Sequence, residues 1–166
     1  LYYGEELGMK GSGKDENKRA PMYWSKDGNA EGMCKGPADM DDFRMKFDSL
    51  EEQQEDPDSI YNYVKQVIRV RNQNPVIARG TTAYLEQYSG EQCFALTRSY
   101  EGSNLLLLGN TSAEAVSVDL TGLTVGGTTA EELVLLGELY TGEETAERAG
   151  TVVTLPAYSI LILGEE

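Results

Sequence analysis

Histidine is absent from this sequence, and cysteine occurs only as Cys34 and Cys93. A Ser-His or Cys-His nucleophilic site is therefore excluded, and so is a zinc site built on its commonest ligand. The two cysteines lie far apart in segments of different character, so their spacing indicates neither a metal site nor a disulfide framework. We expect two free thiols, no metal and no cofactor.

Basic residues are scarce: 14 lysines and arginines stand against 28 acidic residues, which gives a formal net charge of −14. Such a chain has little to pair with phosphate groups and is repelled by anionic lipid surfaces, so nucleic acid and membranes are not expected partners. The sequence also has no apolar run long enough to span a bilayer. The acidity suits a neutral polyol substrate such as a glucan, but we interpret it as a solubility device.

The first part of the chain has little regular patterning. Residues 1–4 contain two tyrosines and predict a short strand, which the glycines that follow should turn. Residues 5–56 show no sustained period and carry many glycines and charges, so this long loop should be functional or disordered. Leu1 stands where a methionine usually does, and we expect the chain to begin inside a longer protein.

A helix is predicted over residues 57–74, followed by a linker over residues 75–79. Asp56 or Asp58 can cap its start, and Pro75 ends it. Its apolar residues recur at the spacing of one helical face: Ile60, Tyr63, Val64, Val67 and Ile68. We interpret this segment as an amphipathic helix that packs on a neighbouring element.

Residues 80–166 change to short β-rich runs separated by glycine and serine turns. The predicted strands are 82–88, 92–100, 104–110, 114–120, 132–136, 151–155 and 158–163. This density predicts a mainly β fold, an antiparallel β-sandwich without an obvious pocket. Leu105–Leu108 is apolar on both faces, which predicts a central strand.

Three stretches in a fixed order carry a family resemblance. Residues 1–9 read LYYGEELGM, residues 16–24 read ENKRAPMYW, and residues 58–80 hold the predicted helix and the passage after it. The first is similar to a YYGEE-G signature after the eighth barrel strand, and the second to a D-N-A-R-x-P-M-x-W segment in the next loop. Together they resemble the C-terminal end of the α-amylase superfamily, glycoside hydrolase family thirteen, especially its oligo-1,6-glucosidase and neopullulanase branch.

The resemblance implies that residues 1–79 are the last strand, loop and helix of a (β/α)₈ barrel, and that residues 80–166 are the domain C sandwich. Enzymes of this family use a retaining mechanism with one carboxylate as nucleophile and another as general acid/base. Those carboxylates follow earlier barrel strands, so the resemblance implies no catalytic residue in this chain. We interpret Glu5 and Glu6 as structural, because neighbours on a strand point to opposite faces.

The resemblance also suggests substrate contacts. The arginine that matches Arg19 hydrogen-bonds sugar hydroxyls in the glucosidase-like branch, a task that suits a planar guanidinium. The alternative is that Arg19 only pairs with an acidic neighbour. Tyr23 and Trp24 can offer an aromatic platform to a sugar ring, although we favour core packing for Met22 and Trp24.

The resulting hypothesis is a parent enzyme that hydrolyses α-glucosidic bonds in starch-derived glucans, with this fragment inactive by itself. The resemblance is to bacterial enzymes, both extracellular and cytoplasmic, and leaves the compartment open. One alternative is a carbohydrate-binding β-sandwich module without hydrolytic activity. Another is a plain stabilising domain, the role that we assign to residues 80–166.

A barrel helix without its partner elements exposes its apolar face. We therefore expect helix 57–74 either to dock on the sandwich or to join two chains as a homodimer. Residues 10–56 are expected to be poorly ordered or held only by such contacts.

Overall fold

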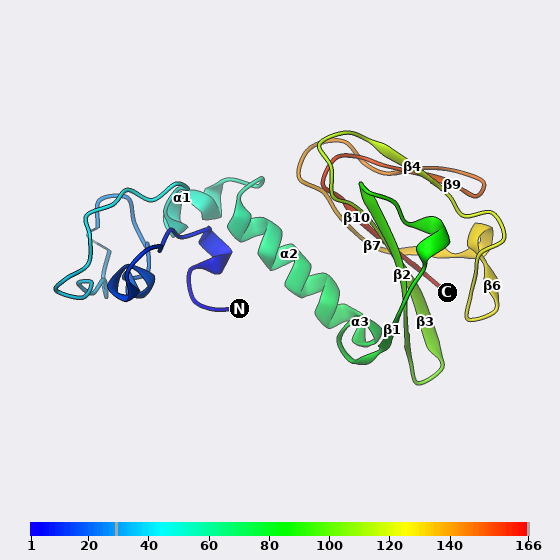
Figure 1. Ribbon diagram of the computed structural model, residues 1–166, viewed down its shortest axis with the longest axis horizontal. Coiled ribbons are helices and arrows are strands. Elements are labelled where there is room, and N and C mark those ends of the chain that lie inside the picture. The colour runs from blue at the N-terminus through cyan, green and yellow to red at the C-terminus, as the bar shows by residue number, and fades with distance from the viewer. Residues whose placement is uncertain (29, 166) are drawn as a thin grey trace. The chain divides into compact units, whose positions relative to one another are not determined.

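Antiparallel strands make up the second part of the chain, as the sequence predicts, and the computed structural model describes residues 1–28 and 30–165 (Figure 1). Contacts divide the chain into two units, Leu1–Lys65 and Gln66–Glu166. Among the described residues, no helix has the length and apolar character needed to cross a membrane. The predicted domain boundary between residues 79 and 80 stays a prediction.

The strands of the second unit form two main sheets and a hairpin. The five-stranded sheet has the order β1 (Thr81–Tyr84), β2 (Cys93–Tyr100), β3 (Ser103–Asn110), β10 (Ile160–Gly164) and β7 (Val134–Leu139). The second sheet has the order β4 (Val116–Asp119), β9 (Val152–Leu155) and β8 (Glu147–Ala149). A hairpin joins β5 (Thr124–Val125) to β6 (Thr128–Thr129). All pairings are antiparallel.

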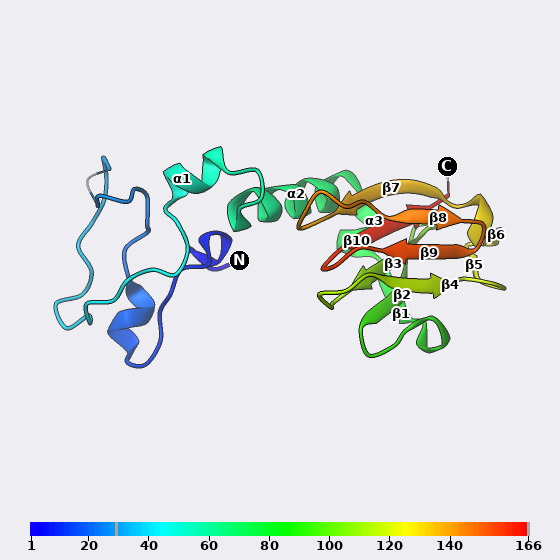
Figure 2. The ribbon, with the colours of Figure 1, turned by 90° about the horizontal axis from the view of Figure 1, so that it is seen from above.

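The core lies between the two sheets, which makes the unit a sandwich (Figure 2). Leu106 and Leu108 of β3 face Val153 and Leu155 of β9 in one buried cluster, together with Leu163 of β10. Each of these side chains is at least 98% removed from solvent, so burial of apolar area is the main stabilising term here. The prediction of a mainly β antiparallel sandwich is therefore confirmed.

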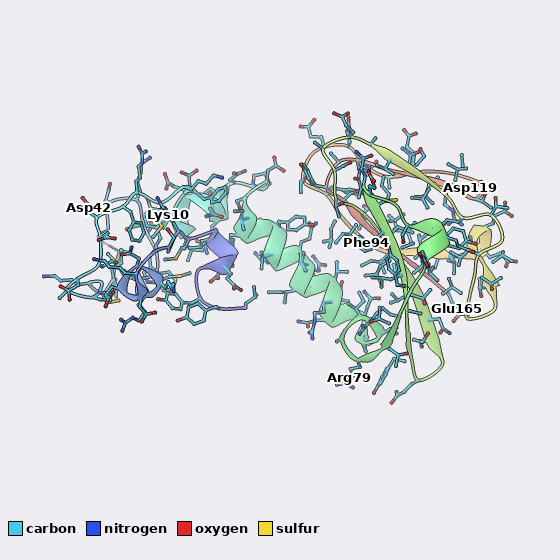
Figure 3. The ribbon with its side chains drawn as sticks, viewed as in Figure 1. Lys10, Asp42, Arg79, Phe94, Asp119 and Glu165 are labelled. Carbon is cyan, nitrogen blue, oxygen red and sulfur yellow. The ribbon has the colours of Figure 1, made fainter. Side chains whose placement is uncertain are left out.

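The central position predicted for Leu105–Leu108 is also confirmed, because β3 pairs with β2 on one side and with β10 on the other. Phe94 of β2 is paired in register with Gly109 of β3. The Phe94 ring lies over Gly109 so closely that a Cβ atom added there would overlap it. Figure 3 labels Phe94 among the strands of the sandwich. Glycine at position 109 therefore leaves room for an aromatic ring on the sheet.

Asn110, at the end of β3, is buried and connects three segments of the sandwich. Its Nδ2 donates to the carbonyl oxygens of Glu114 at 2.7 Å, Leu155 at 3.2 Å and Pro156 at 2.9 Å. Its Oδ1 accepts a hydrogen bond from the backbone N–H of Ser112 at 2.9 Å. Buried polar groups are stable only when they are paired in this way.

The short helix after α2 (Ile60–Gln73) lies against the five-stranded sheet, and α2 meets this sheet near its C-terminal end. The helix α2 places Val70 beside Gly137 of β7, 3.0 Å from where a Cβ atom on that glycine would be. Residues 75–79, predicted as a linker, instead form the short helix α3 (Pro75–Arg79), since proline suits the first turn of a helix. Arg98 of β2 holds α3 by donating to the carbonyl oxygen of Ile77 at 2.7 Å.

The first unit differs from the prediction in two ways. None of the described strands pairs with residues 1–4, and the predicted strand is wrong for these residues. The backbone turns instead into the 3₁₀ helix η1 (Glu5–Leu7), because Gly4 and Gly8 adopt positive φ angles of 87° and 62°. Within the predicted loop 5–56 the structure has a second short 3₁₀ helix, η2 (Asp15–Arg19), and the helix α1 (Leu50–Glu55).

Gln53 of α1 is buried and ties together the segments of the first unit. Its Nε2 donates to the carbonyl oxygens of Leu7 at 3.0 Å and Asp48 at 2.7 Å, and its Oε1 accepts from the backbone N–H of Tyr61 at 3.1 Å. One side chain therefore connects η1, the loop before α1 and the start of α2.

Candidate functional site

A hollow of about 300 Å³ opens in the first unit beside the N-terminal tyrosines. The rings of Tyr2 and Tyr3 lie 4.8 Å apart at an angle of 42°, and Tyr3 Oη donates to the carbonyl oxygen of Ala20 at 3.0 Å. Its other lining residues come from the same unit: Gly4, Glu5, Met9, Lys10, Gly11, Asn17 and Lys18. Figure 3 labels Lys10 in this unit. Its aromatic rings and ammonium donors could contact a polyol.

One wall of this hollow is held by a close backbone approach. A Cβ atom on Gly11 would lie 2.8 Å from the carbonyl oxygen of Asn17, so only glycine fits there without a shift. Asn17 is buried, and its Nδ2 donates to the carbonyl oxygen of Ser12 and to Asp41 Oδ2, both at 2.8 Å. Lys14 Nζ lies 2.8 Å from Asp41 Oδ1. The hydrogen bond from Lys14, and next that from Asn17, lowers the pKa of Asp41.

Arg19 is at the end of η2, between two residues that line the hollow, Lys18 and Ala20. Its Nη2 lies 3.3 Å from Asp15 Oδ2 and 3.7 Å from Glu16 Oε1. All three side chains are solvent-accessible, and exposed ion pairs of this kind contribute only about 0–1 kcal/mol. Of the two roles predicted for Arg19, the structure contains the pairing with acidic neighbours, while contact with a sugar stays a prediction.

Tyr23 and Trp24 are positioned by their backbone. Their carbonyl oxygens accept hydrogen bonds from Leu50 N at 2.9 Å and Glu51 N at 3.1 Å, two N–H groups that the first turn of α1 leaves free. Trp24 is 38% exposed and Met22 is half-buried, so neither belongs to the buried core of this chain, contrary to their interpretation as core residues. Within the described residues, no hydrogen bond or ion pair joins Arg19 to Tyr23 or Trp24.

Glu5 and Glu6 are the adjacent acidic side chains at the start of the first unit. Glu5 and Glu6 share η1 rather than a strand, so the strand alternation used to interpret them does not apply. Glu5 Oε2 accepts a hydrogen bond from the backbone N–H of Tyr2 at 2.9 Å, which is a structural role. Across residues 1–28 and 30–165, no group of three or more acidic or cysteine side chains could hold a metal ion. Both cysteines are free thiols.

Sequence reasoning missed the parts of the site that depend on distant contacts. Asn17 and Asp41 are far apart in sequence and carry no shared pattern, so nothing indicated their hydrogen bonds. The GEELG spacing of Gly4 and Gly8 was the available signal for the turn that shapes the hollow. The sandwich was expected to have no obvious pocket, and the structure has a shallow, open hollow of about 620 Å³ between residues 84–88 and 122–124.

Comparisons with known proteins agree with this architecture. The family model described as the α-amylase catalytic domain matches residues 1–80. The trehalose synthase of Thermus thermophilus is 27% identical over 131 residues, which cover 72% of this chain and 14% of the relative. Alpha-amylase 3 of Dictyoglomus thermophilum is 31% identical over 80 residues, which cover 48% of this chain and 16% of the relative.

Solved structures extend the similarity to the whole chain. Amy13B of Eubacterium rectale superposes with a TM-score of 0.89 at 40% identity, covering 100% of this chain and 31% of that protein. The α-amylase of H. orenii superposes with a TM-score of 0.71 at 26% identity, covering 100% of this chain and 32% of that protein. The chain thus spans less than a third of the length of each of these relatives. Residues 1–80 thus match the catalytic domain of the α-amylase family, glycoside hydrolase family thirteen, and the whole chain has the fold of the corresponding part of Amy13B.

Proposed function

We propose that this chain contributes to a retaining glycosidase that hydrolyses α-glucosidic bonds in starch-derived glucans. The observation that carries the proposal is the match of residues 1–80 to the α-amylase catalytic domain, continued over the whole chain by the fold of Amy13B. Two of the compared proteins are named α-amylases, and a third is named a trehalose synthase. These names concern α-linked glucose, which supports the substrate class.

We propose further that the catalytic carboxylates lie outside this chain. A retaining mechanism requires two carboxyl groups about 5 Å apart, and one of them must hold its proton near neutral pH. Four carboxyl groups here have a shifted pKa, and every shift is downward because a hydrogen-bond donor favours the charged form: Asp41, Glu52, Asp119 and Glu132. A general acid needs the opposite shift. These four carboxyl groups therefore do not meet the requirement for a general acid.

The chain's contribution to the active site would come from the first unit. Arg19 is the residue we propose for hydrogen bonds to sugar hydroxyls, because its surface ion pairs are weak and its five N–H donors exceed what Asp15 and Glu16 occupy. The exposed ring of Trp24 offers an apolar face to the C–H groups of a pyranose, and Tyr23 is a second candidate for this role.

For residues 80–166 we propose a stabilising role. Their core is a buried cluster made mainly of leucine and valine side chains. Removing these residues from the parent enzyme should lower its melting temperature and its expression yield. The rate of the chemical step should change less. A loss of turnover with unchanged melting temperature would contradict this role.

The proposal is tested with the parent enzyme and maltoheptaose, by following the new reducing ends and the anomeric proton of the first product. Release of the α-anomer is expected, since a retaining enzyme preserves the configuration of the bond that it cleaves. No reducing ends, or initial release of the β-anomer, would overturn the proposal.

Arg19→Lys tests the site within the same assay. It keeps the charge but removes the planar fork, so kcat/KM should fall by roughly tenfold. Arg69→Lys is the matched control, because Arg69 is an exposed residue of α2 that lies outside the hollow of the first unit. Equal effects of the two substitutions on kcat/KM would show that Arg19 does not contact the sugar.

A further inference from the structure

The sandwich carries a second candidate site at the hollow between residues 84–88 and 122–124. The hollow has a volume of about 620 Å³ and is wide open, so it can receive one face of a ligand without enclosing it. Its walls are the end of β1 with the 3₁₀ helix η3 (Glu86–Tyr88), and the loop that leads into β5. Figure 2 shows the segment between β1 and β2 projecting beyond the sheet at the β1 edge.

Tyr84 is the aromatic side chain exposed at this hollow. It is the last residue of β1, the outermost strand of the five-stranded sheet, and it is 61% exposed. The neighbouring tyrosine of the hollow, Tyr88, is buried. An exposed ring at the rim of a hollow can stack on a flat, partly apolar ligand without first leaving a packed core.

The two walls are held in place before any ligand arrives. Tyr88 Oη donates to the carbonyl oxygen of Thr121 at 3.2 Å, which joins η3 to the opposite loop. Leu85 N donates to the carbonyl oxygen of Ala95 at 2.9 Å, and Ala130 N donates to that of Leu123 at 3.0 Å. A site whose walls are already fixed loses little conformational entropy when a ligand binds.

The free polar groups of the hollow define its ligand. Glu86, Gln87 and Thr124 are exposed, and in the described part of the chain none of their side chains makes a hydrogen bond, so all three are available as donors or acceptors. No lysine or arginine lines the hollow, and the chain has a net charge of −14, which disfavours an anionic ligand. A tyrosine ring beside neutral and acidic acceptors fits a neutral polyhydroxylated ligand.

We propose that this hollow binds a short stretch of α-glucan chain, with Tyr84 stacking on a glucose ring and Glu86, Gln87 and Thr124 contacting its hydroxyls. The choice of an α-glucan rests on the proposed function, whereas the choice of a neutral saccharide rests on the hollow itself. The site would hold polymeric substrate at a distance from the chemical step rather than take part in it.

The test is an NMR titration of the full ¹⁵N-labelled chain with maltoheptaose. We expect shifts confined to residues 84–88 and 122–124, with saturation in the millimolar range or below. Tyr84→Ala should weaken binding by roughly tenfold or more, which corresponds to the loss of one stacking contact. Tyr84→Phe should retain binding, because the ring is kept. Tyr158→Ala is the matched control, since Tyr158 is 51% exposed elsewhere on the sandwich.

Three results would overturn the site: no shifts up to roughly 10 mM maltoheptaose, shifts confined to residues 1–65, or unchanged binding in a folded Tyr84→Ala chain. Equal binding of cellohexaose would overturn the assignment to α-glucans. The binding measurement does not depend on hydrolysis. If the parent enzyme cleaves no α-glucan but this chain still binds one, the proposed function is refuted and the binding site is not.

Discussion

Asn17 and Asp41 hold each other through a reciprocal pair of hydrogen bonds. Asn17 Nδ2 donates to Asp41 Oδ2 at 2.8 Å, and the backbone N–H of Asp41 donates to Asn17 Oδ1 at 2.9 Å. The pair closes the long loop of the first unit behind the hollow that contains Lys10 and Lys18. The pair thereby connects η2 to a part of the loop that has no regular secondary structure.

Replacing Asn17 with alanine should release this loop. The substitution leaves the Asp41 N–H group and the Ser12 carbonyl oxygen without their partner, at a cost of about 1–3 kcal/mol. Hydrogen exchange at the Asp41 amide should accelerate accordingly. Lys18→Ala, at an exposed neighbouring position, is the control and should change nothing. Unchanged protection of the Asp41 amide in Asn17→Ala would refute the role of the pair.

The Asp41 carboxyl should titrate below its ordinary pKa of 3.8, because Lys14, and after it Asn17, stabilises the charged form. A depressed pKa in the folded state means that this group stabilises the fold above the unfolded value, and that the contribution is lost as pH falls through the folded value. Carbon-detected NMR titration measures the pKa directly. Lys14→Gln should raise it, and an identical pKa in that variant would show that the ion pair has no influence.

Gly109→Ala should destabilise the sandwich, because the added methyl group would overlap the Phe94 ring. Overpacking of this kind costs about 1–3 kcal/mol in the free energy of unfolding. Gly142→Ala is the control: its added methyl group would meet no atom within 4 Å, and the change should stay within about 0.5 kcal/mol. Urea unfolding compares the two. Equal stabilities would mean that Phe94 has another place to pack.

The helix α2 should join two chains when the chain is studied alone. None of its residues is buried, and the apolar Ile68 is 41% exposed. Light scattering should give the mass of a dimer at micromolar concentration, and Ile68→Lys should return it to a monomer. A monomeric wild-type chain would contradict the expected homodimer.

The elements that the sequence predicted well are those with a local pattern. The helix predicted over residues 57–74 spans Ile60–Gln73, and its cap is Ser59 rather than Asp56 or Asp58. Ser59 Oγ accepts a hydrogen bond from Asn62 N at 3.2 Å, a contact that one sequence cannot distinguish from the neighbouring candidates. The apolar run of β3 likewise indicated its central position without tertiary information.

The elements that the sequence missed depend on partners or are very short. The strands β5, β6 and β8 contain only two or three residues and gain their pairing from the adjacent strand. The helix α1 did carry a local signal, the capping box of Ser49 and Glu52, in which Ser49 N donates to Glu52 Oε2 at 3.1 Å. The residues of α1 are mostly polar, so the helix has no apolar periodicity by which it could be predicted.

The family assignment could be made from three motifs, whereas the site could be predicted only in part. Contact of Arg19 with a sugar stays a prediction, and its pairing with Asp15 and Glu16 depends on the turn of η2. The hollow at Tyr84 has no sequence signature, because its two walls come from segments that only the folded sandwich brings together.

The most direct test of the account is an activity assay of the purified chain beside its parent enzyme. Both are incubated with maltoheptaose, and reducing ends are counted over the same period. We predict turnover by the parent and none above the blank by this chain, because a sugar-cleaving pair of carboxyl groups is proposed to lie elsewhere in the parent. Reducing ends produced by the purified chain would contradict the central claim.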